Sequence, residues 1–245
     1  MITNHVELKQ LYIDHFKFRL RERPILPKFK GFESKIEEDF QSILTVTKKN
    51  ILKDWSESDL DKVLRSLKSK QSQDAKGWAN EIFCYKNIGE NLKTSLLMLC
   101  NKVKNTMEIP DFFQDAYISA IPKKKKCPSS LSSERGIFLL NKVRMVFLKL
   151  LYNSNIPNIE KNLSNSNIGG RKGKASRDHL FVLFSIMSDI KQNKTSNCLD
   201  LVWYDLESCF DGLWGTKTYT DLYHNRVQNN SLNLIKKINE NLHSY

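Results

Sequence analysis

The chain has 245 residues, of which 40% are hydrophobic and 27% are charged, and 39 Lys and Arg residues against 27 Asp and Glu residues give a formal net charge of +12. This composition is typical of a folded globular protein with one large or two small domains, and it excludes collagen-like, low-complexity and disordered classes. No apolar run approaches the about 18 residues that a membrane span needs, and residues 1–10 lack the apolar core of a secretory signal, so we expect no membrane partner.

The N-terminal half is dominated by helical patterns. Residues 16–30 alternate Phe and Leu with Lys and Arg, which predicts an extended basic arm or a frayed helix end. Apolar residues recur at helical spacing in residues 33–53. A second helix follows, where Ser56 and Asp59 have the form of a capping box. A third helix is predicted from about Gly89 to Asn105.

Beyond Pro110 the pattern changes to short β-prone runs. Residues 116–121 and 136–140 flank a lysine-rich loop, so a β-hairpin is predicted there. Residues 141–153 then read as a buried helix, because their apolar residues fall on one face.

The C-terminal third begins with a polar loop at residues 165–174 that holds three glycines, followed by a helix capped by Ser176 and running to about Lys191. Residues 198–205 predict a buried strand that ends on an acid, and residues 216–227 and 231–242 predict two more helices. A carboxylate at a strand end can meet metal and phosphate, although it can equally cap the following helix.

The positive charge is gathered in three clusters, within residues 17–30, 123–126 and 171–177. Separate basic clusters suggest a surface that meets a polyanion such as nucleic acid, although basic proteins without such a partner are also common. The five cysteines form no Cys-x-x-Cys pair, which favours a reducing compartment and argues against zinc.

Five segments carry an ordered set of motifs. They are Ser72-Gln-Asp-Ala-Lys-Gly77, Ile109-Pro110 with residues 116–123, Arg135-Gly-Ile-Phe-Leu-Leu-Asn141, Asn167-Ile-Gly-Gly-Arg-Lys-Gly-Lys-Ala-Ser-Arg-Asp178 and Asp205-Leu-Glu-Ser-Cys-Phe-Asp211. In this order they resemble the reverse transcriptases, or RNA-directed DNA polymerases, of the non-long-terminal-repeat (LINE-type) retrotransposon family. The third is similar to Arg-Pro-Ile-Ser-Leu-Leu-Asn, with Gly136 in place of Pro. The last is similar to Asp-x-x-x-Ala-Phe-Asp, with Cys209 in place of Ala.

The resemblance implies an α+β, helix-rich fold with the fingers and an incomplete palm of a right-hand polymerase. It divides the chain into a basic N-terminal helical extension (residues 1–70), a fingers-like part (71–192) and the start of a palm (193–245). The family's Tyr or Phe-x-Asp-Asp hairpin has no counterpart, because the sequence contains no adjacent Asp pair. We therefore expect a fragment, truncated after the first catalytic-Asp motif and without a thumb.

The resemblance also assigns metal and nucleotide contacts near the last motif. Asp205 matches the first catalytic carboxylate, and the carbonyl of Leu206 would be a second ligand of the same Mg²⁺. Phe210 matches the position under the sugar of the incoming deoxynucleotide, although it can instead be an ordinary core residue. Mg²⁺ is expected for the complete enzyme, with weak or no binding in this chain.

Two further groups of residues are assigned to nucleotide and template. Lys123 and Arg135 match the basic positions of the fingers hairpin that face the incoming triphosphate, although the neighbouring lysines could also serve. The polar loop matches a template-gripping segment, or is simply a flexible loop. Its assigned residues are Gly169, Arg171, Gly173 and Lys174.

The leading expectation is thus a reverse transcriptase fragment. Its complete relative performs RNA-templated DNA synthesis by two-metal nucleotidyl transfer on an RNA template, an RNA–DNA duplex and deoxynucleotides. This chain alone is expected to be inactive. The alternatives are a non-catalytic RNA- or DNA-binding module and a degenerate retroelement relic. An intracellular location, in nucleus or cytoplasm, is expected, and secretion is not.

Overall fold

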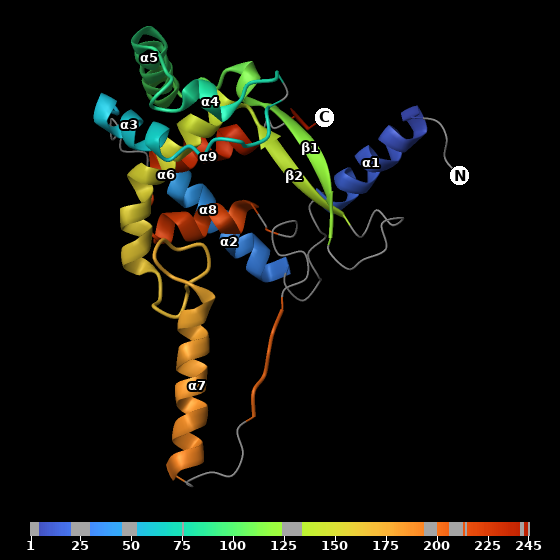
Figure 1. Ribbon diagram of the computed structural model, residues 1–245, viewed down its shortest axis with the longest axis vertical. Coiled ribbons are helices and arrows are strands. Elements are labelled where there is room, and N and C mark those ends of the chain that lie inside the picture. The colour runs from blue at the N-terminus through green and yellow to red at the C-terminus, as the bar shows by residue number, and fades with distance from the viewer. Residues whose placement is uncertain are drawn as a thin grey trace.

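The computed structural model describes residues 5–20, 30–45, 53–74, 76–123, 134–193, 200–205, 213, 215–240 and 243–244. In chain order its elements are α1 (His5–Leu20), α2 (Lys30–Thr45), α3 (Glu57–Arg65), α4 (Asn80–Phe83), α5 (Glu90–Thr106), the 3₁₀ turn η2 (Asp111–Phe113), β1 (Asp115–Pro122), β2 (Glu134–Leu140), α6 (Lys142–Asn162), α7 (Ser176–Asn193), α8 (Gly215–His224), α9 (Asn229–Glu240) and β3 (His243–Ser244). The fold is helix-rich α+β with one small sheet, which confirms the general class predicted (Figure 1).

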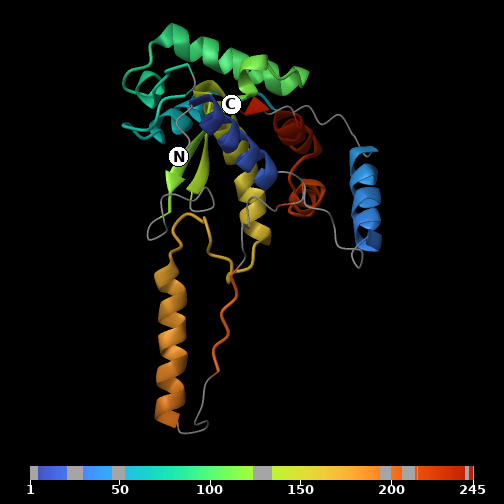
Figure 2. The ribbon, with the colours of Figure 1, turned by 90° about the vertical axis from the view of Figure 1, so that its right-hand side faces the viewer.

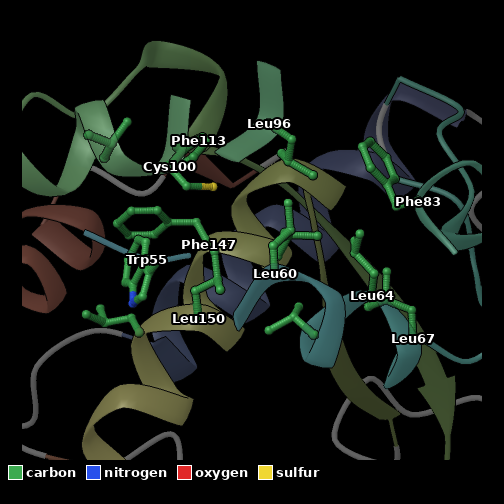
Figure 3. Packing of buried hydrophobic residues seen from close by; sticks show 14 of the residues in the cluster. Trp55, Leu60, Leu64, Leu67, Phe83, Leu96, Cys100, Phe113, Phe147 and Leu150 are labelled. Atoms are coloured by element: carbon green, nitrogen blue, oxygen red, sulfur yellow. The ribbon is translucent and has the colours of Figure 1, made fainter. Parts of the chain in front are cut away.

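The hydrophobic core lies between α3, α5, α6 and α9 (Figure 3). Phe147 stands at its centre, with its ring edge-on to Trp55 at 5.5 Å and tilted against Phe113 at 5.6 Å. Leu234 and Ile238 of α9 complete the same cluster. All three parts into which the chain was divided therefore contribute to one core.

The predicted β-hairpin is confirmed. β1 and β2 pair antiparallel with Ala116 opposite Leu140 and Pro122 opposite Glu134. The two-residue β3 adds a parallel neighbour to the other side of β1, which gives the order β2-β1-β3. This third strand was not predicted, because two residues carry no detectable alternation.

The predicted helices form, with differences at their ends. The apolar face of α2, formed by Ile36, Phe40 and Ile43, is buried, and Phe40 stacks on Tyr219 of α8 at 5.9 Å. Within residues 16–30, the part up to Leu20 belongs to α1, and residues 21–29 lie outside the described ranges.

Two more helices differ from their predicted bounds. α6 continues nine residues beyond the predicted end at Asn153 and contains Pro157, so the proline did not stop it. α7 begins at Ser176, so Ser176 is not its cap. Asp178 instead accepts a hydrogen bond from the backbone N–H of Ala175 at 2.9 Å, so its carboxylate supports the first turn of the helix.

The prediction of a buried strand at residues 198–205 is wrong for the residues that the structure describes. Residues 200–205 form no strand and are exposed, with exposed fractions of 76% at Trp203 and 91% at Tyr204. The segment runs beside α7, and the two extend away from the body as an arm (Figures 1 and 2). An apolar run signals that burial is favourable, but burial also needs a neighbour that covers the run.

Searching the described helices finds none long and apolar enough to cross a membrane. Cys84 and Cys100 are both free thiols, and Cys100 is buried in the core. Burial raises the pKa of the Cys100 thiol to about 12. This thiol is therefore protonated and unreactive at neutral pH.

The predicted capping box of α3 is confirmed and gives a first testable expectation. The Asp59 carboxylate accepts from the backbone N–H of Ser56 at 3.1 Å and from its hydroxyl at 2.8 Å, and these bonds lower the pKa of Asp59 below its usual 3.8. Asp59→Ala is expected to lower the free energy of unfolding by about 1 kcal/mol at neutral pH. Because the folded-state pKa is lowered, this contribution is complete above pH 3.8 and is lost as the pH falls further.

Urea titrations of parent and variant at neutral pH and near pH 3 measure this difference. Asp39→Ala, which removes an exposed carboxylate from α2, is the matched control and is expected to change little. A stability gap between parent and Asp59→Ala that stays constant down to pH 3 would contradict the capping role.

Candidate nucleic-acid interface

Lys123 and Arg135 lie on one face of the hairpin, near the end from which the strands lead into the lysine-rich loop. The register places Arg135 directly opposite Ile121, and Lys123 follows Ile121 by two residues, immediately after β1. Side chains two residues apart on a strand share a face, as do directly opposed pairs. Arg135 is exposed and Lys123 is half-buried. The structure therefore places these two sequence-predicted residues at the same end of the hairpin.

The same face carries exposed apolar side chains. Tyr117, Ile121 and Ile137 have exposed fractions of 46%, 48% and 42%. The face thus combines a basic end with a flat apolar surface. That combination suits a ligand with an anionic group and an aromatic ring.

Glu134 lies on the opposite face of the hairpin from Arg135. Its carboxylate is largely buried and accepts a hydrogen bond from the Tyr12 hydroxyl of α1 at 2.9 Å. This bond, together with burial, raises the pKa of Tyr12. The acid next to Arg135 in sequence is therefore held by α1 and does not lie on the basic face.

Asp74 joins the first and third motifs. One carboxylate oxygen accepts from the backbone N–H groups of Lys76 and Trp78, both at 2.9 Å, and the other accepts from the N–H of Lys142 at 3.0 Å. The Lys142 ammonium donates back to the carbonyl of Ser72 at 2.6 Å. A buried carboxylate thus holds the turn of residues 72–78 against the first turn of α6.

Sequence reasoning quoted this turn but gave Asp74 no role. The available signal was Asp74 followed three residues later by Gly77, which has φ +78°, because Asp side chains commonly organise such turns. The partner on α6 could not be found in this way, since it lies 68 residues away in sequence.

The loop assigned to template gripping is a series of turns between α6 and α7. Gly170 and Gly173 have φ values of +70° and +77°, which favours glycine at both positions. The Arg171 guanidinium pairs with Glu160 of α6 at 2.6 Å and donates to the carbonyls of Ser164 and Asn167, each at 2.9 Å.

The Arg171 side chain is only 11% exposed, so its charge holds the loop together. A nucleic-acid phosphate would have to compete with Glu160 for it. Lys174 and Gly169 of the same loop are both exposed. Of the loop's assigned cations, Lys174 is therefore the one placed to meet a template.

Asp205 is exposed and ends the segment that runs beside α7. Leu206 and Phe210 lie outside the described residues. Over the ranges that the structure describes, His, Cys, Asp and Glu side chains form no group of three or more that could hold a metal ion. Of the three residues assigned to metal and nucleotide near the last motif, the structure therefore describes Asp205 alone.

The assigned residues thus fall into three places: the hairpin face, the loop before α7, and the segment that ends at Asp205. The hairpin lies on the body of the molecule, whereas the Asp205 segment belongs to the arm (Figure 1). A scan of the sequence against models of known protein families finds no match. The functional assignment rests for this reason on the motifs and on the geometry of these three places.

Proposed function

We propose that this chain contains the fingers and the beginning of the palm of a reverse transcriptase domain of the non-long-terminal-repeat retrotransposon type. The observation that carries the proposal is the position of Lys123 and Arg135. Two basic side chains from different motifs, twelve residues apart in sequence, share one face at one end of a hairpin. A planar Arg and a mobile Lys at this spacing suit the phosphates of a nucleotide.

The junction at Asp74 adds support. It packs the first motif against the residue that directly follows the third, so the two behave as one structural unit. The junction thereby fixes the start of α6 at the Leu140 end of the hairpin, which is the opposite end of the strands from Lys123 and Arg135. A rigid base of this kind is what a phosphate-binding hairpin needs, because its affinity depends on pre-organised side chains.

The described residues do not fit a pair of Mg²⁺ ions. In-line nucleotidyl transfer by two metals needs several carboxylates around both ions, and Asp205 is the single carboxylate assigned here. The sequence also offers no adjacent Asp pair. We therefore assign no catalytic step to this chain, and propose that it does not synthesise DNA by itself.

A primer-extension assay tests both parts of this proposal. With an RNA template, a DNA primer and either Mg²⁺ or Mn²⁺, the chain is expected to bind the duplex but to incorporate no deoxynucleotide. The double variant Lys123→Ala and Arg135→Ala is expected to abolish the binding of a deoxynucleotide. Incorporation that Asp205→Ala removes would show that the chain is active and overturn the proposed inactivity. A complete lack of binding to RNA, duplex and deoxynucleotide would instead overturn the relationship to polymerases.

A non-catalytic nucleic-acid-binding module is the second candidate. It is favoured by the exposed cations Arg135 of the hairpin and Lys174 of the loop, which occur without a metal-binding cluster in the described ranges. Such a module binds nucleic acid with an affinity that falls steeply as the salt concentration rises. It neither incorporates nor binds deoxynucleotides, and this result distinguishes it from a polymerase fragment. A degenerate relic would show a broad thermal transition in place of a cooperative one.

A further inference from the structure

A pocket lies between the end of α3 and α4, and none of its lining residues belongs to the three places described above. Its volume is about 360 Å³, within the range of pockets that hold small ligands. Leu64 and Leu67 form a buried apolar floor, and the half-buried thiol of Cys84 lies beside them. A flat, mostly apolar group of modest size fits such a floor.

One wall of the pocket is a stacked pair of side chains. The guanidinium carbon of Arg65 lies 3.8 Å from the centre of the Tyr85 ring, and both side chains are exposed. A guanidinium at this distance covers the ring face in a cation–π contact. The guanidinium face that points away from the Tyr85 ring is a planar surface on which an aromatic ring can stack.

A hydrogen-bond acceptor lies at the pocket wall. Oε1 of Glu81 accepts from the backbone N–H of Lys70, while Oε2 is buried and has no hydrogen-bond partner among the described residues. The Lys70 N–H lowers the pKa of the Glu81 carboxyl, so it stays ionised and can only accept. Glu81 is thus a fixed, negatively charged group that makes this wall of the pocket polar.

The surroundings of the pocket are basic. Glu81 is the single carboxylate among the described lining residues. Two of the lining residues, Arg65 and Lys86, are exposed cations, and the chain that leads from α3 to α4 carries three more, Lys68, Lys70 and Lys76. An anionic ligand is therefore attracted to this surface, and a phosphate can be contacted without displacing an internal ion pair.

These four properties are those of an unstacked nucleobase with its flanking phosphates. We propose that the α3–α4 pocket takes up one base of a single-stranded nucleic acid, with the base stacked on the Arg65–Tyr85 pair and resting on the apolar floor of Leu64 and Leu67. The surrounding lysines contact the phosphates on either side. This surface is separate from the hairpin face, so the inference stands whether or not the chain is related to polymerases.

Fluorescence anisotropy with a labelled single-stranded RNA of about ten nucleotides tests the inference. The informative variant is Arg65→Lys, which keeps the positive charge but removes the planar stacking surface. It is expected to weaken binding about fivefold or more, as is Tyr85→Leu, because stacking of one base carries an effect of this size. Lys102→Ala removes an exposed cation from α5 and is expected to change the affinity less than twofold.

Double-stranded RNA of the same length is the second probe, since its paired bases cannot enter a pocket. We expect it to bind more weakly than the single strand at the same salt concentration. Equal affinity for both, or an Arg65→Lys variant that binds like the parent, would show charge attraction alone and overturn the inference. Thermal melts of the variants are run in parallel, because both side chains are exposed and their replacement is expected to leave folding unchanged.

Discussion

Replacing Asp74 by Ala is expected to lower the free energy of unfolding by about 3 kcal/mol. The variant leaves the N–H groups of Lys76, Trp78 and Lys142 without their acceptor, and the Lys142 site is buried. Water can replace the carboxylate at the two exposed residues of the turn but not at the start of α6. For a protein of this size the expected fall in melting temperature is about 6–12 °C.

Asp74→Asn separates the two halves of this interaction. The amide oxygen can still accept from the turn, but the amide nitrogen then meets the N–H of Lys142, so one bond is lost and two donors oppose each other. An intermediate loss of stability is expected. Asp200→Ala, which removes an exposed carboxylate, is the control and should stay within about 0.5 kcal/mol of the parent. Equal stability of Asp74→Ala and Asp200→Ala would contradict the role of Asp74.

Features that depend on residues close together in the chain could be predicted from the sequence, whereas contacts between residues far apart in the chain could not. The capping box at Ser56 and Asp59 and the hairpin of residues 116–121 and 136–140 were predicted correctly, because each is set by residues close together in the chain. Their register could then be used to place Lys123 and Arg135. For the same reason the loop before α7 was located, since its glycines act on the backbone around them.

What the sequence could not supply were partners distant in the chain. Arg144 reads as an ordinary cation on a helix, yet it is buried and donates to the carbonyl of Phe113 at 2.6 Å. Burial lowers the pKa of the Arg144 guanidinium. The residues next to Arg144 in the sequence give no sign that it is buried. Likewise, the motif assigned Arg171 to the template. Its ion pair with Glu160 could not be predicted, because that contact depends on how the loop folds back on α6.

In the arm, the sequence predicted burial that the structure does not show. Residues 198–205 are rich in apolar residues, and this pattern was taken to predict a buried strand. The neighbouring helix α7, for which no burial was predicted, is exposed as well. The structure describes Phe181 and Phe184 of α7 with exposed fractions of 74% and 62%. Hydrophobicity alone therefore does not distinguish core residues from arm residues. Phe147 and Phe181 are the same residue type, and they differ in whether other elements pack against them.

That distinction can be measured with one pair of matched substitutions. Phe147→Ala removes a fully buried ring that packs between Trp55 and Phe113, and is expected to cost about 4 kcal/mol. Phe147→Leu fills most of the space and should cost clearly less. The melting temperature of Phe147→Ala is expected to fall by about 8–16 °C.

Phe181→Ala makes the same chemical change on the exposed arm, and is expected to alter stability by no more than about 0.5 kcal/mol. Chemical denaturation of the three variants side by side gives the comparison directly. If Phe181→Ala destabilises the protein as much as Phe147→Ala, then the arm packs against something in solution, and its exposure as described here is wrong. If only the Phe147 variant is destabilised, the cooperative unit is the core between α3, α5, α6 and α9, and the Phe181 side chain on the arm adds nothing to its stability.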